Sequence, residues 1–478
     1  MTCFIPRVIF ILFAFALFAC RSEYENSISV QLTYPDSASA AYRAVADTEN
    51  QTASQNSVYA SYAINPSNRI LIRVISPDFG PIEAWFERSE GRGVIRNVPP
   101  GGRISVEVDE YDSSAAVLGT DAVLLGRGWT RGITLSPGEA KTVNVAMYAK
   151  GTILTICGRE GDSGDGGLSH DAKIRNPSAV KVGPDDSIYF SSFGNRKVKR
   201  IDRYGYVSNF AGNGGIGLVG VFGTDASFVP IDSVSDIDIE PAGNVYLFTY
   251  SNQIVKVSSS GIIQDVVYDN GVIDHVGGPW FNLAVVSNGM LYFVNYSDKR
   301  VYQIFDSVKS DAVRDDTPHS LAEPIDRFNY PISNPSGITY ASSSNSLIFT
   351  DTNNNRIMEL SFIDSKIRYL VAGSGYFSEG VAPLSMEPIK PRVVDYNPIT
   401  GKIFFVEEGE NRVLYITADN VVRTFAGTGT ASFSGDGGPA TEAQLYDPRG
   451  ITVDSRGNAY IADFGNHAIR VVVGGALP

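Results

Sequence analysis

Four histidines are the side chains of this 478-residue chain best suited to acid–base chemistry or metal binding near neutral pH. They stand far apart in the sequence, at His170, His275, His319 and His467. The chain has no His-x-x-x-His pair and no Cys-x-x-Cys pair, the spacings that place two zinc ligands side by side. We therefore assign no catalytic residue and expect no metal site and no cofactor.

Three glycine-rich segments are the next candidates for a ligand site, and they lie at residues 161–167, 212–220 and 427–438. None has the Gly-x-x-x-x-Gly-Lys-Ser/Thr pattern that cradles phosphate. Four nearby carboxylates could supply oxygen ligands to calcium, namely Asp162, Asp165, Asp436 and Glu442. The spacing of an EF-hand loop and its closing glutamate are missing, however. Because glycine tolerates positive φ, we expect these segments to be turns between structural units.

A secretory leader is predicted for residues 1–19. Arg7 precedes an apolar run of 12 residues, 8–19, which is too short for a membrane span of ~20 residues. The run ends in Leu17-Phe18-Ala19-Cys20, which resembles the lipobox of bacterial lipoproteins. The resemblance implies cleavage after Ala19 and attachment of lipid to Cys20, through which the chain would be anchored in a membrane. The alternative is an ordinary signal peptide with a chance cysteine.

A short polar tether, residues 20–26, follows this leader. No Asp comes directly after Cys20, which by analogy with enterobacterial sorting favours the outer membrane or the cell surface of a bacterial envelope. Cys3 would leave with the leader and Cys20 would carry lipid, so that Cys157 has no partner for a disulfide. We expect Cys157 to be a packed and unreactive strand residue.

The charge balance argues against nucleic acid as a partner. The chain has 52 acidic and 39 basic residues, a formal net charge of −13, and no run of Lys or Arg. Hydrophobic residues make up 43 % of it, and Tyr and Phe number 24 and 25 against 5 Met. This composition indicates a folded protein rich in β-structure.

Residues 27–150 show short alternating strands separated by turn residues. Ile104, Val106 and Val108 alternate after a Pro-Pro-Gly-Gly turn at residues 99–102. Strands that recur every 8–12 residues or so with Pro and Gly turns are typical of antiparallel sandwiches. We predict an Ig-like β-sandwich over 27–150, which contains no catalytic grouping and would serve as a spacer or adhesive module.

From residue 151 onward the sequence repeats itself. The centres of one strand type are Tyr189, Tyr246, Tyr292, Ile348, Phe404 and Tyr460. Successive centres are 57, 46, 56, 56 and 56 residues apart, and further short strands accompany most of them. Units of about four short strands at a fixed period predict a β-propeller, here with six blades.

One of these units resembles a known repeat family. Residues 448–470 are similar to an NHL repeat and include the Asn466-His467 pair of its name. The units at 176–201 and 334–360 are similar, whereas those at 235–257 and 283–304 depart from the motif. The resemblance covers 151–478 and implies a six-bladed NHL-type propeller. It implies no particular activity.

The ring is expected to close through its first strand. The sixth unit contains only three strands before residue 478, whereas residues 152–157 match the fourth strand of the fifth unit, 421–427. Both segments precede a Gly-Asp-Gly-Gly sequence. We therefore predict that strand 152–157 completes the last blade, which removes exposed sheet edges.

Binding is the function that these features favour over catalysis. A closed propeller presents loops from all blades, together with its central channel, to one protein, glycan or matrix partner. The alternative is a propeller-fold lyase or hydrolase acting in the cell envelope, and a purely architectural role is a third possibility. Similar six-bladed enzymes, such as streptogramin lyases and peptidylglycine amidating lyases, imply a central metal or an acid–base histidine. In this chain, we would look for such a group around His275 or in residues 306–327, which include His319.

Overall fold

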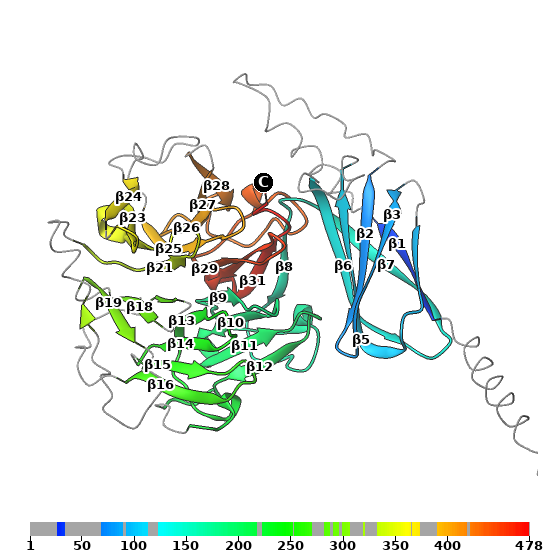
Figure 1. The fold of residues 1–478 in the computed structure, drawn as a ribbon, viewed down its shortest axis with the longest axis horizontal. Helices are drawn as coiled ribbons and strands as arrows, with labels where there is room; N and C mark the ends of the chain where they lie inside the picture. Colours follow the sequence, from blue (N-terminus) through cyan, green and yellow to red (C-terminus); the bar gives the residue numbers. More distant parts are fainter. Residues whose placement is uncertain are drawn as a thin grey trace, which may run out of the picture. The chain divides into compact units, whose positions relative to one another are not determined.

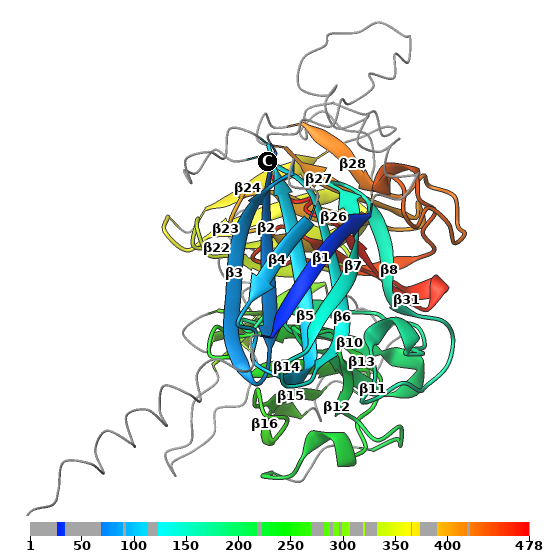
Figure 2. The ribbon, with the colours of Figure 1, turned by 90° about the vertical axis from the view of Figure 1, so that its right-hand side faces the viewer.

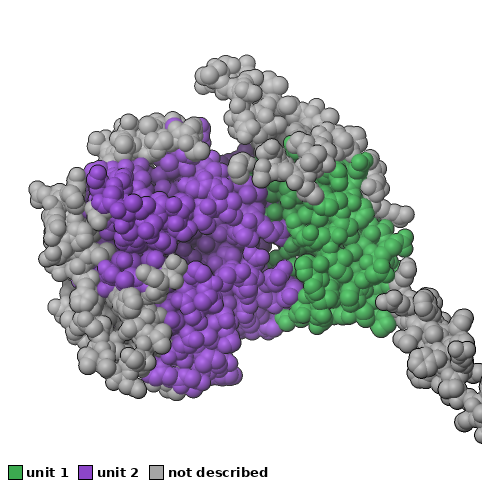
Figure 3. Space-filling model, viewed as in Figure 1, with its two compact units in different colours: residues 1–150 green, residues 151–478 purple. Residues whose placement is uncertain are grey.

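The structure is a computed structural model that describes residues 26–33, 68–88, 92–112, 123–217, 222–251, 253–269, 282–286, 290–295, 299–305, 319–320, 332–364, 366–372, 390–417 and 421–477. The chain divides into two compact units, residues 1–150 and 151–478 (Figure 3). The described residues contain no helix of the length and hydropathy needed to cross a membrane.

The first unit consists of one seven-stranded sheet, in the order β3-β2-β5-β6-β7-β1-β4 (Figure 2). Its strands are β1 (Ser27–Thr33), β2 (Arg69–Ser76), β3 (Phe79–Glu87), β4 (Arg92–Arg96), β5 (Gly101–Tyr111), β6 (Leu124–Leu135) and β7 (Ala140–Ala149). Alternate residues of these strands point into one core, as Ile104, Val106 and Val108 of β5 do. Period-two alternation of apolar residues therefore produces a sheet with one buried face.

The predicted Ig-like sandwich over 27–150 differs from this arrangement. All seven strands belong to one sheet, and β1 pairs in parallel with β7. The cause lies at the β6–β7 corner, where the two strands pair at only three positions, beginning with Gly126 and ending with Gly128. A Cβ atom at Gly128 would lie 2.3 Å from the carbonyl oxygen of Ala146, so glycine permits a close passage at which β7 leaves β6 for β1.

The second unit is a six-bladed β-propeller, as the repeat predicts (Figure 1). Its described strands form six sheets of four. The blades are β9 (Val180–Val182), β10 (Ile188–Ser192), β11 (Lys197–Ile201) and β12 (Val207–Ala211); β13 (Val234–Ile239), β14 (Val245–Thr249), β15 (Gln253–Val257) and β16 (Ile263–Asp269); β17 (Leu283–Val285), β18 (Met290–Asn295), β19 (Arg300–Phe305) and β20 (His319–Ser320); β21 (Ile338–Ala341), β22 (Ser346–Asp351), β23 (Arg356–Ser361) and β24 (Ile367–Ala372); β25 (Pro391–Tyr396), β26 (Ile403–Glu407), β27 (Arg412–Ile416) and β28 (Val422–Ala426); and β29 (Pro448–Val453), β30 (Ala459–Asp463), β31 (Ala468–Val472) and β8 (Ile153–Gly158).

The first strand of each blade lies innermost. The strands β9, β13, β17, β21, β25 and β29 contact one another in sequence, and β29 returns to β9. The second strands are largely buried because both of their faces are covered by neighbouring blades, and all five residues of β10 and of β14 are buried. Figure 3 shows the surface of this unit hollowed near its centre.

The ring is closed by β8, which pairs antiparallel with β31 in the sixth blade (Figure 2). The register places Ile153 opposite Val472 and Gly158 opposite Ala468. The far edge of β8 is also engaged, since the Gly437 N–H donates to the Ile153 carbonyl at 2.9 Å. Residues about 300 positions apart in the chain therefore complete one sheet and leave no open edge between the ends of the ring.

The two edges of the ring differ. The turns from second to third strands and the crossing loops from fourth strands to the next blade share one edge, because the strands alternate in direction within each blade. We call this edge the crossing face; its described segments include turns 193–196, 250–251, 352–355, 408–411 and 464–467 and loops 159–179, 212–217, 222–233 and 427–447. The opposite edge, with the first-to-second and third-to-fourth turns, is the hairpin face.

Replacement of Leu154 by proline should destabilise the whole ring. Leu154 lies opposite Val471 in the closing pair, and proline offers no N–H to the ladder. We expect a loss of at least about 2 kcal/mol in the free energy of unfolding, measured by guanidinium denaturation followed by circular dichroism. Leu154→Ala keeps the N–H and is the control. Equal losses in the two variants would contradict the role of this strand pair.

Candidate functional site

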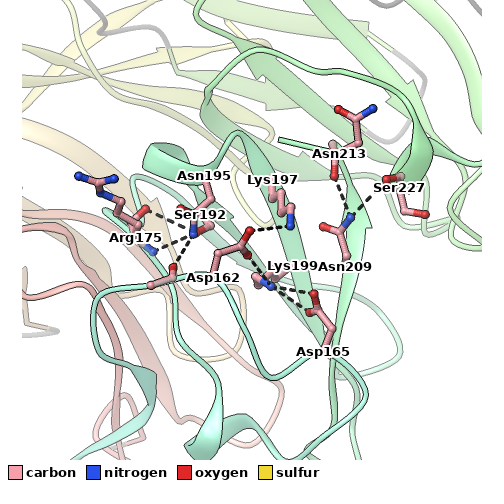
Figure 4. A network of polar contacts seen from close by, with 12 residues as sticks. Asp162, Asp165, Arg175, Ser192, Asn195, Lys197, Lys199, Asn209, Asn213 and Ser227 are labelled. Atoms are coloured by element: carbon pink, nitrogen blue, oxygen red, sulfur yellow. Dashed lines mark hydrogen bonds and ion pairs between the residues drawn. The ribbon is translucent and has the colours of Figure 1, made fainter. Parts of the chain in front are cut away.

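The glycine-rich loops are fastened to the blades by their carboxylates. The Lys199 side chain is fully buried, and its Nζ lies 2.9 and 3.0 Å from the two carboxylate oxygens of Asp165 (Figure 4). Asp162 in the same loop lies 2.7 Å from Lys197 Nζ. A buried ammonium needs such partners, because an unpaired charge is costly inside a protein. The loop carboxylates are therefore part of the framework.

The sixth blade repeats this arrangement with an arginine. The Arg470 side chain is fully buried, and its Nη2 donates to Asp436 Oδ1 at 2.8 Å and to the Ser434 carbonyl at 3.0 Å. Asp436 therefore corresponds to Asp165, in the Gly-Asp-Gly-Gly sequence of its own loop. Asp165 and Asp436 are thus both paired with basic side chains, and no group of three or more potential metal ligands occurs among the described residues.

His467 connects neighbouring blades. It has a left-handed backbone, with φ 53°, at the end of the turn that follows β30. Its Nδ1 accepts the N–H of Asn176, the residue that begins the approach to the first blade, at 3.1 Å. Asn411 occupies the same place in the fifth blade and accepts the N–H of Asp447 at 2.9 Å. The polar residue at this position is thus an acceptor that orders the next crossing loop.

The other candidate residues that the structure describes lie in separate places. His170 is exposed, with its Nε2 3.3 Å from Asp171, and His319 lies in β20 of the third blade. His275 lies outside the described residues, as does Cys20. Cys157 is buried in β8, and burial raises the pKa of its thiol to about 12, so it stays protonated and weakly nucleophilic at neutral pH.

Three aromatic side chains form an arc on the crossing face. They begin the turns after the second strands of the sixth, first and second blades and are Phe464, Phe193 and Tyr250. The ring centroids of Phe193 and Phe464 are 6.3 Å apart, and those of Phe193 and Tyr250 are 6.1 Å apart. Phe193 therefore links both neighbours, and Tyr250 is 50 % exposed. We call these three residues the aromatic arc.

An arginine is fixed against one end of the aromatic arc. The Arg449 guanidinium lies over the Phe464 ring, with its carbon 3.3 Å from the ring centroid. Asp447 holds Arg449 through two hydrogen bonds, at 2.9 and 2.6 Å, and also accepts from Arg392 Nη1 at 3.0 Å. Burial, and then the charge of Arg449, lower the pKa of Arg392 to about 10. Arg392 therefore remains charged at neutral pH.

The crossing face also carries most of the exposed large hydrophobic side chains of the propeller. In the described part of this unit, eight such residues are exposed. Five lie on the crossing face: Ile216, Phe228, Tyr250, Phe433 and Tyr446. Phe222 also belongs to a crossing loop but lies at its outer turn, next to Gly223, whose N–H donates to the Ile263 carbonyl at the start of β16. The other two, Ile363 and Ile399, lie on the hairpin face. Large apolar groups that gather on one face of a soluble protein commonly mark an interaction site.

A ring of residues, one on each of the six inner strands, lies at the same register position around the axis. Each of these side chains lies opposite one of the six strand centres of the repeat, and in blade order they are Lys181, Asp238, Ala284, Thr339, Asp395 and Thr452. Lys181 Nζ lies 2.7 Å from Asp395 Oδ1 and 3.6 Å from Asp238 Oδ1. Burial disfavours the ammonium, but Asp395 and Asp238 outweigh it and hold the pKa of Lys181 above its usual value. One lysine thus joins the first, second and fifth blades.

A second carboxyl lies beside this ring. Asp236 accepts the N–H of Leu283 at 2.8 Å, and Asp238 accepts that of Val285 at 2.7 Å, which ties the second blade to the third. Burial raises the pKa of Asp236 to about 7. Asp236 and Asp395 thus have the raised pKa values that acid–base chemistry uses, but their described partners are Lys181, the Asn282 side chain and backbone amides. The crossing face is therefore a stronger candidate for a functional site than the axis.

Two sequence patterns mark the ring of inner-strand residues and the aromatic arc. Lys181 is a charged residue between two valines in a short apolar strand, at the position that pairs with Tyr189. Phe193 and Phe464 share a Phe-Gly-Asn sequence directly after their strands. Both features belong to the repeat, and the repeat alone does not reveal which way their side chains face.

Replacement of Lys181 by methionine should leave Asp238 and Asp395 without their cation. We expect a loss of about 3–5 kcal/mol in the free energy of unfolding near pH 8. Without the ammonium the folded carboxyls would have raised pKa values, so the folded state would bind more protons than the unfolded one and the loss would shrink toward about pH 5. Guanidinium denaturation at both pH values measures this.

The double variant Lys181→Met with Asp395→Asn is the control for charge. It removes one uncompensated carboxylate and should recover part of the loss at the higher pH. A single variant as stable as the parent at both pH values would show that the axial ion pair does not hold the blades together.

Comparison with known proteins agrees with this architecture. The family model of the NHL repeat matches residues 445–472, which contain β29, β30 and β31. Human teneurin-1 is 22 % identical over 396 residues, 73 % of this chain and 14 % of teneurin-1, and mouse teneurin-4 is 24 % identical over 358 residues, 64 % of this chain and 12 % of that protein. The chain thus spans only about one seventh of the length of these relatives.

Solved structures that resemble the chain include a propeller named as an enzyme and one named for binding. A streptogramin B lyase is 16 % identical with a TM-score of 0.42, over 67 % of this chain and 96 % of that one. An auxiliary nutrient binding protein from Bacteroides ovatus is 15 % identical with a TM-score of 0.48, over 84 % of this chain and 90 % of that one. The present chain is a six-bladed β-propeller protein with an NHL repeat in its sixth blade.

Proposed function

We propose that the propeller is a binding module that takes a protein or glycan partner on its crossing face. The observation that carries the proposal is the gathering of five of the eight exposed large hydrophobic side chains of the described propeller on that face. The aromatic arc and the Arg449 guanidinium lie on the same face. Aromatic and arginine side chains are the types enriched where binding energy is concentrated.

The propeller holds in place the crossing loops that carry these aromatic and apolar side chains. Lys199 and Arg470 fasten two crossing loops to their blades, and His467 and Asn411 order the approaches to the next blades. A partner that binds these loops would therefore meet a surface that loses little conformational entropy on binding. This rigidity is the physical advantage of a closed ring over a set of free loops.

The lyase or hydrolase alternative has weaker support. Acid–base catalysis needs groups that converge at substrate distance with a free acceptor or donor. In the described part of the axis the carboxyls of Asp236, Asp238 and Asp395 meet Lys181 and backbone amides, and His467 accepts a backbone N–H. The exposed large hydrophobic groups of the crossing face are mostly aromatic, which fits binding better than chemistry.

Polar substitution of Phe228 and Tyr250 should weaken binding without destabilising the fold. These side chains are 78 and 50 % exposed, so little burial is lost when they become serine. The full chain, purified in detergent, would be tested against a glycan array and a displayed peptide library. We expect the affinity of the selected ligand to fall at least about tenfold, because exposed aromatic side chains are common anchors.

The matched control is the double variant Ile363→Ser with Ile399→Ser. These side chains are 76 and 53 % exposed but lie on the hairpin face. Thermal unfolding should be the same for both double variants. If the hairpin-face pair weakens binding as much as the crossing-face pair, or if no ligand depends on Phe228 and Tyr250, the proposed function is wrong.

We further propose that the chain is a bacterial lipoprotein held in the cell envelope, at the outer membrane or cell surface, by lipid on Cys20. The support is the sequence alone, namely Arg7, the apolar run 8–19 and the lipobox-like segment that ends at Cys20. Two or three acyl chains would give stable anchoring, whereas a single one would bind the membrane only weakly.

Replacement of Cys20 by serine should abolish this anchoring. In a bacterial host fed an alkyne-labelled fatty acid, the parent chain should incorporate the label and sediment with membranes. The Cys20→Ser chain should remain unlabelled and leave the membrane fraction, while Cys157→Ser, as the control, should behave like the parent. Labelling of the Cys20→Ser chain at the parent level would refute lipid attachment at this residue.

A further inference from the structure

Asp236 is a buried carboxyl that has no Lys or Arg nitrogen within 4.0 Å in the described part of the propeller. It lies on β13, the innermost strand of the second blade, and is 7 % exposed. Its Oδ2 accepts the Leu283 N–H at 2.8 Å, and the Asn282 side chain is its other described partner. A buried carboxylate that no cation neutralises is costly, because the charge loses its hydration. Asp236 therefore has a physical reason to hold a proton.

The cation that acts on Asp236 is shared with two other carboxyls. Lys181 Nζ lies 2.7 Å from Asp395 Oδ1 and 3.6 Å from Asp238 Oδ1. With all three carboxyls ionised, this axial group would have one positive and three negative charges. Burial raises the pKa of Asp236 to about 7, Lys181 counteracts this rise only in part, and Asp238 adds to it.

Asp236 and Asp238 connect the second blade to the third. They lie two residues apart on β13, and each accepts a backbone N–H from β17, the innermost strand of the third blade. The donors are Leu283 at 2.8 Å and Val285 at 2.7 Å. The edge of one inner strand is thus held by carboxyl side chains of the preceding one.

The links described at two other blade boundaries are hydroxyl groups. The Ser178 hydroxyl of the first blade donates to the Val234 carbonyl of the second at 2.8 Å, and the Ser336 hydroxyl of the fourth blade donates to the Arg392 carbonyl of the fifth at 2.8 Å. Serine hydroxyls do not change their charge between pH 4 and pH 9 or so. The link between the second and third blades is different because its side chains can titrate.

The third blade depends more than the others on such links. Its fourth strand, β20, has two residues and pairs with β19 at two positions, whereas the described fourth strands of the other blades have five to seven residues. Its first strand, β17, has three residues. Elements with few backbone hydrogen bonds open locally at the lowest cost in free energy.

We propose that Asp236 is a pH-sensitive latch between the second and third blades, which takes up a proton as the pH falls through the neutral range and then holds the third blade most firmly. Protonation adds a hydrogen to Oδ1, removes one negative charge from the axial group and leaves Oδ2 to accept the Leu283 N–H. Asn282 can serve both states, because an amide donates through its N–H to a carboxylate and accepts through its carbonyl from the acid.

The direction of the effect follows from proton linkage. The pKa of Asp236 is about 7 in the folded propeller against an ordinary value of 3.8. The closed junction therefore binds more protons than an opened one in which Asp236 meets water, and it gains stability as the pH falls from about 7 toward about 4. Lys181 stays charged over this range, and Asp238 and Asp395 are the other carboxyls of the axial group.

Hydrogen exchange of the full chain in detergent, followed by mass spectrometry at about pH 5.5 and about pH 8, measures the latch. Exchange rates are divided by the intrinsic rate at each pH, which gives a protection factor for the peptides that contain Leu283 and Val285. We expect this protection to be at least about tenfold higher at the lower pH. Peptides of β22, in the fourth blade, report how the rest of the ring responds and should change less.

Asp236→Asn should abolish this pH dependence. The amide has nearly the same shape, cannot ionise, and can still accept the Leu283 N–H through its carbonyl, so protection at both pH values should match that of the parent in acid. Asp225→Asn is the matched control. Asp225 is an exposed carboxylate that accepts the Ser227 N–H, a role asparagine also fills, and this variant should keep the full parental rise.

The parent alone can refute the latch, even if Asp236→Asn does not fold. Protection around Leu283 that is equal at the two pH values, or lower in acid, would overturn the inference, as would an equal rise in β17 and β22. A parental rise that persists in Asp236→Asn, or that disappears in Asp225→Asn, would show that another group titrates and would also overturn it.

Discussion

Pairing of β8 with β31 is the interaction on which the propeller depends. It joins residues 153–158 to residues 468–472 and converts a row of six sheets into a ring. Every inner strand then has a neighbour on both sides, and the face on which the loops are displayed becomes a fixed surface. The axial ion pair of Lys181 and Asp395 adds a second link between blades that are not adjacent in the chain. A partner on the crossing face would therefore bind to a framework that the β8–β31 pair closes into a ring and that the Lys181–Asp395 ion pair links across the axis.

Contacts within the propeller occupy most of the side chains whose types suggest catalysis or metal binding. Asp165 and Asp436 are paired with buried cations, and His467 orders the next blade. What remains on the crossing face is a different set: the aromatic arc and the exposed apolar side chains. A ligand-binding role would therefore depend on the exposed Phe, Tyr and Ile side chains and not on the histidines or the loop carboxylates.

The propeller could be predicted from the sequence repeat, whereas the candidate site could not. A period of about 56 residues with a buried strand centre is a physical consequence of stacked blades, so six blades could be predicted from Tyr189 to Tyr460. Orientation is what a sequence pattern lacks: nothing in the apolar stretch 180–182 says that Lys181 spans the axis to Asp395. The first unit shows another limit. Alternation predicted its strands, but the passage of β7 past Gly128, which makes one sheet of seven strands, depends on the approach of Ala146.

Hydroxyl-radical footprinting of the full chain, with and without its tightest library-selected ligand, tests the central claim most directly. The account predicts that bound ligand protects Phe193, Tyr250 and Phe228 on the crossing face while Ile363 and Ile399 on the hairpin face keep their reactivity. Protection confined to Ile363 and Ile399, or to residues of the first unit, would contradict it.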